Sequence, residues 1–438
     1  MNSDTGGAAV RPPSRPGILA IRPEERPAVI GGFLLFFLLF TSWFMLRPVR
    51  ETFGIAGGVG NLQWLFTATF LSTLVVVPIY GWAAARLPRR RLLPIAYLIS
   101  AVVMTGFGVS LALDPGNVWV ARVFYVWSSV FNLFVISIAW SLLADVLDRD
   151  QSQRMFGQIA AGASLGGLTG PVLSGLLVAP LGEAGLLFLS TGLLVATLVC
   201  VAWLLRWRDR MGPRADGHQP PRIGGSIWGG LKLIAGSPYL LAVAAFVLLL
   251  TSVTTFLYFE QARIVAETFP DRTRQTQVFS AIDAGVQAST IFIQLFLTGW
   301  LARRLGVIVL LTLTPVVMVF GFGLLALAAT FPVLVFVMVV RRVGEYALVR
   351  PGREMLFAPL DAETKYKAKN AIDTFVYRGG DMLSAWLSTG VTAIGSAAAA
   401  AVLGAGIAAL WAVTGAFIGR RHDAAADGPR PRGFRSGG

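Results

Sequence analysis

Long apolar runs recur along the whole chain, and each is long enough to cross a bilayer, which takes about 20 mostly apolar residues. Hydrophobic residues make up 55 % of the 438 residues and charged residues only 14 %. Lipid forces a chain to satisfy its own backbone polar groups, and these runs are too long for barrel strands. The predicted fold class is therefore an all-α polytopic membrane protein with twelve helical spans, at 28–48, 62–86, 92–113, 117–146, 154–179, 184–206, 238–263, 274–302, 306–329, 331–357, 367–396 and 398–420.

A polar stretch at 207–237 divides these spans six and six. We predict an N-terminal six-helix bundle at 27–206, a cytoplasmic linker at 207–237 and a C-terminal six-helix bundle at 238–420. Residues 1–26 are rich in Pro, Gly and Arg and are expected to form a disordered tail. A second tail follows at 421–438. The first apolar run leads into RPVRE rather than a small-residue cleavage site, so we expect a retained helix rather than a signal peptide.

Basic residues follow the even-numbered spans and fill the linker and the C-terminal tail, whereas the loops after spans 3, 5, 9 and 11 carry no Lys or Arg. Basic residues collect in cytoplasmic loops, so both termini are predicted to be cytoplasmic, in a bacterial inner membrane. The same distribution accounts for the net charge of +14 without a nucleic-acid partner. We expect a monomer whose partners are the lipid bilayer and a small solute.

Few residues suit enzyme chemistry. The single cysteine, Cys200, lies in an apolar run, and the two histidines, His218 and His422, lie in the linker and the tail. The chain has no phosphate-binding GxxxxGK[ST] loop. We therefore expect no enzyme activity, no metal site and no cofactor.

The two halves of the sequence resemble each other. GWAAARL at 81–87 matches GWLARRL at 299–305, RPVRETF at 47–53 matches RIVAETF at 263–269, and LDRD at 147–150 matches LDAE at 360–363. The offsets are all close to half the chain length. Two six-helix repeats in the same orientation are typical of a major-facilitator-type transporter, which works by alternating access.

Ionisable residues inside the spans are the candidates for function, because burying them in a membrane is costly. Arg341 and Arg342 lie about 15 Å along span 10, near the midplane at 1.5 Å per residue. Glu345 follows at helical pairing distance from both. Two interpretations stay open, a substrate cavity lined by the arginines or a structural pair with Glu345.

Span 11 repeats this pattern. Arg378 lies near the midplane, and Asp381 three residues later is placed to neutralise it. Gly379 and Gly380 between them favour a close helix contact. Asp373 lies one to two turns into the same span.

The internal repeat accounts for some of the charged residues in the cluster RPVRE at the end of span 1, but not for all of them. Arg47 and Glu51 recur as Arg263 and Glu267, so a structural Arg–Glu pair is predicted in both halves, whereas the counterpart of Arg50 is Ala266. We therefore predict that Arg50 contacts substrate and that Arg47 is structural. On this prediction Arg50→Ala impairs transport with little loss of folded protein.

These basic residues predict a cavity for an anionic, phosphorylated substrate, since arginine binds phosphate through its fork of donors. The predicted substrate-binding residues are Arg50, Arg341, Arg342 and Arg378. The predicted supporting or coupling residues are Arg47, Glu51, Glu260, Asp283, Glu345, Arg350, Arg353, Asp373 and Asp381.

Several segments resemble one family. LRPVRETFGIAGG, NLQWLFTATF, SLLADVLDRDQSQRMFGQIAAGASLGG and RPGREMLFAPLDAETKYKAKNAIDTFVYRGGD are similar to the nucleotide (ATP/ADP) transporters of plastids and intracellular bacteria, and most of all to their free-living bacterial branch. The resemblance implies a major-facilitator-like fold and nucleotide exchange without hydrolysis. It also implies functional basic residues at Arg50 and Arg378, where plastid-type carriers have lysine. Of the family's functional glutamates in helices 4 and 7, the first region holds Tyr125 and the second offers Glu260.

Two alternatives remain from the sequence. One is a proton-coupled carrier of another organic anion, with Glu260, Asp283 or Asp373 as the proton site. The other is a non-transporting membrane scaffold, in which the buried arginines all pair internally and no central cavity exists.

Overall fold

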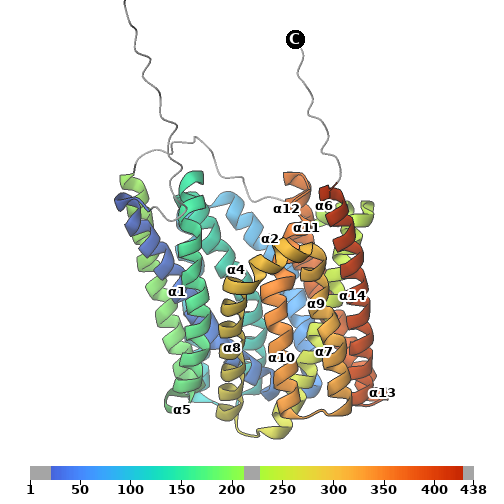
Figure 1. Ribbon diagram of the computed structural model, residues 1–438. Helices are drawn as coiled ribbons and strands as arrows, with labels where there is room; N and C mark the ends of the chain where they lie inside the picture. The colour runs from blue at the N-terminus through green and yellow to red at the C-terminus, as the bar shows by residue number, and fades with distance from the viewer. Residues whose placement is uncertain (1–20, 212–226, 428–438) are drawn as a thin grey trace, which may run out of the picture.

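The computed structural model describes residues 21–211 and 227–427, which form helices and no strand. The long helices lie side by side in one bundle and run from one end of it to the other (Figure 1). The beginning of α1, the end of α14 and the short helices α6, α11 and α12 all lie at one end, the upper end in Figure 1. The predicted all-α polytopic fold is confirmed.

The described part of the first half contains the helices α1 to α5 after a short 3₁₀ turn, η1 (Pro23–Glu25). Helix α5 holds two predicted spans, because Gly182 at its middle has φ 67° and breaks the helix. A positive φ is a conformation that glycine adopts readily. Figure 1 shows the two arms of α5 running in opposite directions. The helices are α1 (Arg26–Ala56), α2 (Leu62–Arg86), α3 (Arg89–Leu113), α4 (Val118–Val146) and α5 (Arg149–Arg210), with η2 (Val59–Asn61) between α1 and α2.

The second half is more interrupted. Three five-residue π-helical segments divide its helices, and Gly306, with φ 73°, bends α9 near its start. The elements are α6 (Ile227–Gly236), α7 (Pro238–Thr268), α8 (Arg272–Ile293), η3 (Gln294–Thr298), α9 (Gly299–Leu327), α10 (Phe331–Gly344), η4 (Glu345–Val349), α11 (Arg350–Leu356), α12 (Ala362–Ala371), η5 (Ile372–Val376), α13 (Tyr377–Ile394) and α14 (Ala397–Asp427).

Nine of the described helices are long and apolar enough to cross a membrane by length and composition. The pair of spans in α5 counts once in that number. Spans 10 and 11 are each divided by a π-helical segment, at η4 and η5, so neither forms one long α-helix. These two helical columns and the two arms of α5 account for the difference from the twelve predicted spans.

Several predicted boundaries differ from the structure. Helix α1 continues to Ala56, so RPVRE lies inside the helix rather than after it. Its charges are tolerated there because they face a polar cavity rather than lipid. The predicted linker begins as the last turn of α5 and ends as α6, while residues 212–226 lie outside the described part. Likewise η1 and the first residue of α1 fall in the predicted tail 1–26, of which 1–20 are not described.

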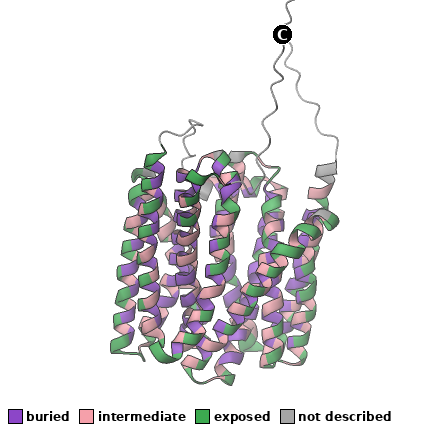
Figure 2. Cartoon of the chain, turned by 60° about the vertical axis from the view of Figure 1, so that its left-hand side comes forward, coloured by how far each residue is buried: buried purple, intermediate pink, exposed green. Residues whose placement is uncertain are grey.

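The buried apolar residues form two large clusters. One draws on residues between Ala28 and Trp207, the other on residues between Ile234 and Ile418. Figure 2 shows buried positions facing inward and many exposed ones facing outward along the helices. The outward faces carry large apolar side chains, such as Leu71, Val75 and Ile79 on α2, as expected of surface that contacts lipid.

Small residues let α1 and the first arm of α5 cross closely. A Cβ added at Gly162 would lie 2.3 Å from the carbonyl oxygen of Phe33, and one at Gly166 would lie 2.4 Å from that of Phe37. Real Cβ atoms do not approach so closely. This contact fixes α1, and with it the charged residues near the end of α1.

Candidate functional site

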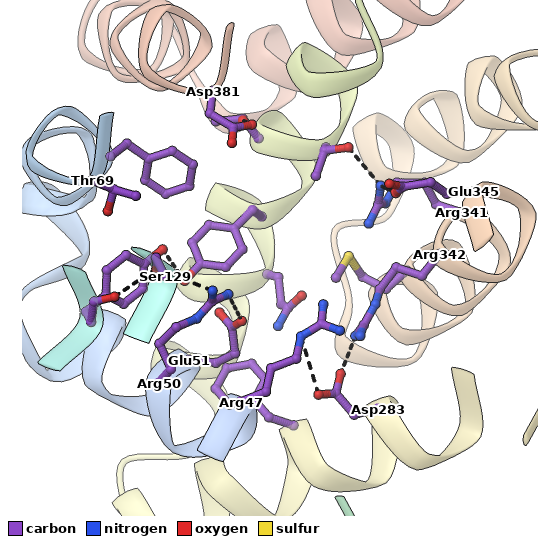
Figure 3. A pocket seen from close by; sticks show the side chains of 18 of the residues that line it. Arg47, Arg50, Glu51, Thr69, Ser129, Asp283, Arg341, Arg342, Glu345 and Asp381 are labelled. Carbon is purple, nitrogen blue, oxygen red and sulfur yellow. Dashed lines mark hydrogen bonds and ion pairs between the residues drawn. The ribbon is translucent and has the colours of Figure 1, made fainter. Parts of the chain in front are cut away.

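A central cavity of about 210 Å³ lies between the two halves of the chain (Figure 3). Its walls come from α1, α2 and α4 of the first half, and from α7, α8, α10, η4 and α13 of the second. The lining residues are Arg47, Arg50, Glu51, Phe66, Thr69, Tyr125, Ser129, Thr254, Thr255, Tyr258, Gln261, Phe279, Asp283, Met338, Arg341, Arg342, Glu345, Tyr346, Tyr377, Arg378 and Asp381.

All four predicted substrate-binding arginines line this one cavity, together with a fifth, Arg47. They come from three helices far apart in the sequence. Four acids also line the cavity, so the formal balance is five positive charges against four negative ones, an excess of one. The acids are Glu51, Asp283, Glu345 and Asp381.

Arg341 and Arg342 turn to different partners. Arg341 Nη1 donates to Glu345 Oε2 at 2.6 Å and to Thr254 Oγ1 at 2.8 Å. Arg342 Nη1 instead donates to Asp283 Oδ1, in α8. Successive residues on a helix point about 100° apart. The predicted pairing with Glu345 is therefore confirmed for Arg341 and wrong for Arg342.

The cluster on α1 is also paired differently from the prediction. Arg50 Nη2 donates to Glu51 Oε1 at 2.5 Å, while Arg47 donates to the Tyr346 hydroxyl at 3.2 Å and lies 3.6 Å from Asp283. The predicted Arg47–Glu51 pair is wrong, because Arg47 reaches across to the second half.

The second half does form the predicted pair. Arg263 Nη1 lies 3.0 Å from Glu267 Oε2, and Arg263 also binds Glu260 at 2.5 Å. Arg263 and Arg47 occupy matching positions in the repeat, but only Arg47 lines the cavity. The repeat is thus a guide to the backbone and not to the side-chain contacts.

Arg378 joins α13 to the first half. Its Nη2 donates to the carbonyl oxygen of Ser129 at 3.3 Å, and its Nη1 lies 3.5 Å from Asp381 Oδ2, the predicted partner. A Cβ added at Gly380 would lie 2.4 Å from Thr251 Oγ1 of α7, which confirms the close helix contact. That contact positions Arg378 and Asp381 at the cavity wall.

Four other predicted residues do not line the cavity. Asp373 lies 3.2 Å from Arg353, so these two neutralise each other, and Arg350 is exposed. Glu260 forms an ion pair with Arg263. These charges are close to the cavity in sequence but lie on other faces of their helices.

The sequence reasoning missed the aromatic side chains of the wall. Tyr125 OH donates to Tyr258 OH at 3.1 Å, which joins α4 to α7, and the Arg50 guanidinium lies 5.3 Å from the centre of the Tyr125 ring. Phe66, beside both tyrosines, and Tyr377 also line the cavity. In an apolar span such rings are ordinary lipid-facing or core residues, and only Tyr125 is pointed to, through the family resemblance in helix 4.

Several buried guanidinium atoms of the cavity arginines have no acceptor among the described residues. They are the Nε atoms of Arg50, Arg341 and Arg342, and Nη2 of Arg342. A buried donor without an acceptor costs about 1–3 kcal/mol. Arg341 and Arg342 are only 6 % and 4 % exposed. These arginines therefore keep hydrogen-bonding capacity that their partners among the described residues do not use.

Contacts between the halves also lie beside the cavity residues, toward the end of the bundle at which α1 and α7 finish. Thr52 and Thr276 hydroxyls lie 2.8 Å apart, linking α1 to α8. Leu62, Leu65 and Ala262 pack with Tyr125 into a small apolar cluster from α2, α4 and α7. These contacts join the two halves near the ends of α1 and α7.

The site fits anion binding rather than catalysis. Arginine forks suit carboxylate and phosphate oxygens. Among residues 21–211 and 227–427 no group of three potential metal ligands occurs. A polar, charged chamber between two helical halves is the arrangement expected for a transported solute.

Comparisons with known proteins agree with this arrangement. The chain is 24 % identical over 363 residues to ADP,ATP carrier protein 1 of Chlamydia trachomatis, and 24 % identical over 321 residues to ADP,ATP carrier protein 1 of Chlamydia muridarum. The matches cover 73 % and 64 % of this chain, and 67 % and 60 % of the respective carriers.

The fold is also that of solved transporters. A crystal structure of a mutant of nucleoside transporter NupG superposes with a TM-score of 0.64 over 89 % of this chain and 99 % of that one, at 14 % identity. The family model described as Major Facilitator Superfamily matches residues 28–345, well over half of the chain. The protein is therefore a membrane transporter rather than an enzyme, and it belongs to the Major Facilitator Superfamily.

Proposed function

We propose that the protein exchanges nucleotides such as ATP and ADP, or a related phosphorylated anion, across the membrane by alternating access. The observation that carries this proposal is the convergence of five arginines from both halves on one cavity between them. Similarity to the two Chlamydia carriers supports the nucleotide as substrate.

In this proposal Arg50, Arg341, Arg342 and Arg378 bind phosphate oxygens, and Arg47 joins them. Charge-assisted hydrogen bonds from arginine to phosphate are among the strongest available to a protein. Glu51, Glu345 and Asp381 each lie within 3.5 Å of one of these arginines and hold its side chain at the wall.

The aromatic wall suits the other end of a nucleotide. Phe66, Tyr125, Tyr258 and Tyr377 offer ring faces and hydroxyls beside the arginines. Aromatic rings stack on nucleobases of any sequence. The cavity volume of about 210 Å³ lies below the roughly 300–1,000 Å³ of typical ligand sites. The closed walls therefore need to part for a whole nucleotide to enter, as alternating access requires.

We further propose that the halves, 27–206 and 238–420, rock about this cavity in a bacterial inner membrane, with both termini cytoplasmic. The beginning of α1 and the end of α14 lie at the same end of the bundle (Figure 1). Ion pairs such as Arg90–Asp209, at 2.6 Å, and Lys369–Glu354, at 2.5 Å, join helix ends. The basic members of these pairs follow even-numbered spans, which the positive-inside rule assigns to the cytoplasm.

A second candidate is a proton-coupled carrier of another organic anion. Of its three proposed proton sites, Asp283 alone lines the cavity, and it lies between two arginines. Asp283 is thus engaged in ion pairs with Arg47 and Arg342, and the other two proposed sites lie away from the cavity. A scaffold without a central cavity is not favoured either, because the cavity is present.

The test is counterflow in liposomes that contain the purified protein. Liposomes loaded with unlabelled ADP are expected to accumulate labelled ATP and ADP against a background of empty liposomes. A panel of nucleoside monophosphates, sugar phosphates and organic carboxylates would define the substrate class. Failure of every nucleotide and every other phosphorylated anion to exchange would reject the proposal, and uptake driven only by a proton gradient would favour the second candidate.

A further inference from the structure

Asp283 differs from the other acids of the cavity. It is 2 % exposed, and it lies between Arg342 of its own half and Arg47 of the other half (Figure 3). Glu51, Glu345 and Asp381 each pair, among the described residues, with one arginine of their own half. Asp283 therefore forms an ion pair that joins the two halves across the cavity.

The two ion pairs of Asp283 differ in strength and exposure. Arg342 and Asp283 are both 4 % exposed at their side chains and share a short hydrogen bond. Arg47 is 18 % exposed, and its Nε lies 3.6 Å from Asp283 Oδ2 without meeting the geometry of a hydrogen bond. The Arg47–Asp283 pair is thus the weaker and more accessible of the two to an anion that enters the cavity.

We propose that Asp283 acts as an internal substitute for the substrate anion. In the empty cavity it holds Arg47, and so holds α1 of the first half against α8 of the second. A phosphate oxygen competes for the same guanidinium, since both are oxyanions that accept from arginine. Once substrate takes Arg47, Asp283 stays with Arg342 and this one ion-pair link between the halves is released.

This inference rests on the proposed function, and it explains why transport would be an exchange. An empty carrier keeps the Arg47–Asp283 link and does not reorient, whereas a loaded carrier has lost the link and does. Asp283 is thus a positioning residue that couples occupancy to conformation, and it need not touch the substrate.

Asp283→Asn separates this role from simple support of the arginines. Removing a competitor for Arg47 is expected to tighten ADP binding about tenfold, the lower end of the coupling seen for close charge pairs. It is also expected to allow ADP uptake into liposomes that contain no nucleotide, so that the ratio of net uptake to counterflow rises about tenfold. If Asp283 only positions the arginines, binding weakens instead, as it does in Arg342→Gln, and the ratio stays at the wild-type value.

Arg47→Gln provides a second variant, because it breaks the same link, together with the Arg47–Tyr346 hydrogen bond, and leaves Asp283 paired with Arg342. It strands no buried acid, so it is expected to fold even if Asp283→Asn does not. Its ADP affinity is expected to fall while its ratio of net uptake to counterflow rises. A ratio that stays at the wild-type value in Arg47→Gln would overturn the inference.

Glu25→Gln is the matched control. Glu25 is 1 % exposed and binds Arg154 through both carboxylate oxygens, at 2.7 and 2.8 Å, but it does not line the cavity. It should leave both the affinity and the ratio unchanged in the protein that folds. If wild-type protein fails every counterflow assay, the proposed function fails and this inference with it. If wild-type protein exchanges ADP but the variants keep its ratio, only the inference fails.

Discussion

Arg50 offers a prediction that separates stability from substrate binding. Its guanidinium lies 2.5 Å from Glu51 Oε1, 3.5 Å from Ser129 Oγ and 5.3 Å from the centre of the Tyr125 ring. Arg50→Gln removes the cation and strands Glu51, whose side chain is 8 % exposed. The sequence alone predicts little loss of folded protein for this residue, and the structure revises that expectation.

The stability cost follows from the burial of the pair. Removing one partner of a buried ion pair costs about 3–5 kcal/mol. The Arg50 side chain is 17 % exposed to the cavity. We therefore expect about 2–3 kcal/mol for Arg50→Gln, below the fully buried range because water screens the pair. Arg50→Gln with Glu51→Gln strands no charge, so the double variant is expected to regain most of this stability.

The effect on binding should not be regained. A hydrogen bond to a charged group contributes about 1.5–3 kcal/mol, which corresponds to roughly a tenfold to 150-fold loss of ADP affinity. Thermal unfolding in detergent measures the first effect, and ADP binding with counterflow measures the second. A double variant that recovers both stability and wild-type ADP affinity would refute a substrate contact at Arg50.

The packing of α5 against α1, the Thr52–Thr276 contact and the Glu25–Arg154 ion pair can each be tested by substitution. Gly166→Ala should lower the free energy of unfolding by about 1–3 kcal/mol, because its Cβ would lie 2.4 Å from a carbonyl oxygen of α1. At Gly157 an added Cβ would have no atom of a neighbouring element or side chain within 4 Å. Gly157→Ala should therefore leave the free energy of unfolding unchanged or raise it by about 0.4–1 kcal/mol, as measured by thermal unfolding. Thr52→Cys with Thr276→Cys should form a disulfide, since the hydroxyls lie 2.8 Å apart, and oxidation should block exchange until reductant is added. Full exchange by the cross-linked protein would show that the halves need not separate there. Glu25→Gln should cost about 2–3 kcal/mol in thermal unfolding without changing ADP affinity, less than a fully stranded charge because Asp150 still accepts from Arg154 at 3.1 Å; unchanged stability would mean that the Glu25–Arg154 ion pair contributes nothing.

The sequence predicts the architecture well, because a membrane span needs a long run of apolar residues that is visible in the sequence. Twelve apolar runs and the internal repeat lead to the observed bundle. The arginines of the cavity also stand out, since an ionisable residue in an apolar span needs a reason to be there. Arg50, Arg341, Arg342 and Arg378 were found in this way.

The partners of these arginines depend on tertiary contacts and could not be predicted. Helical spacing alone assigns Glu345 to both arginines of α10, yet Arg342 turns to α8. The repeat assigns Glu51 to Arg47, yet Arg47 crosses the cavity. Asp373 looked equally suited to the cavity, but the face of η5 that it occupies brings it to Arg353.

Local geometry and aromatic lining were equally hidden. The π-helical segment η4 contains the cavity residues Glu345 and Tyr346, and η5 ends directly before the cavity residue Tyr377; such segments often occur at functional sites. No spacing in the sequence marks them. Tyr125 and Tyr258 lie in apolar runs, where a tyrosine is an ordinary residue.

The central claim is that the arginine cavity holds the phosphates of a transported nucleotide. A structure of the protein with bound ADP tests it most directly. We predict phosphate oxygens within hydrogen-bond distance of Arg342 and of at least one arginine of α1, with the base against the aromatic wall. Phosphates bound elsewhere, or a cavity that stays empty at a saturating ADP concentration, would contradict the claim.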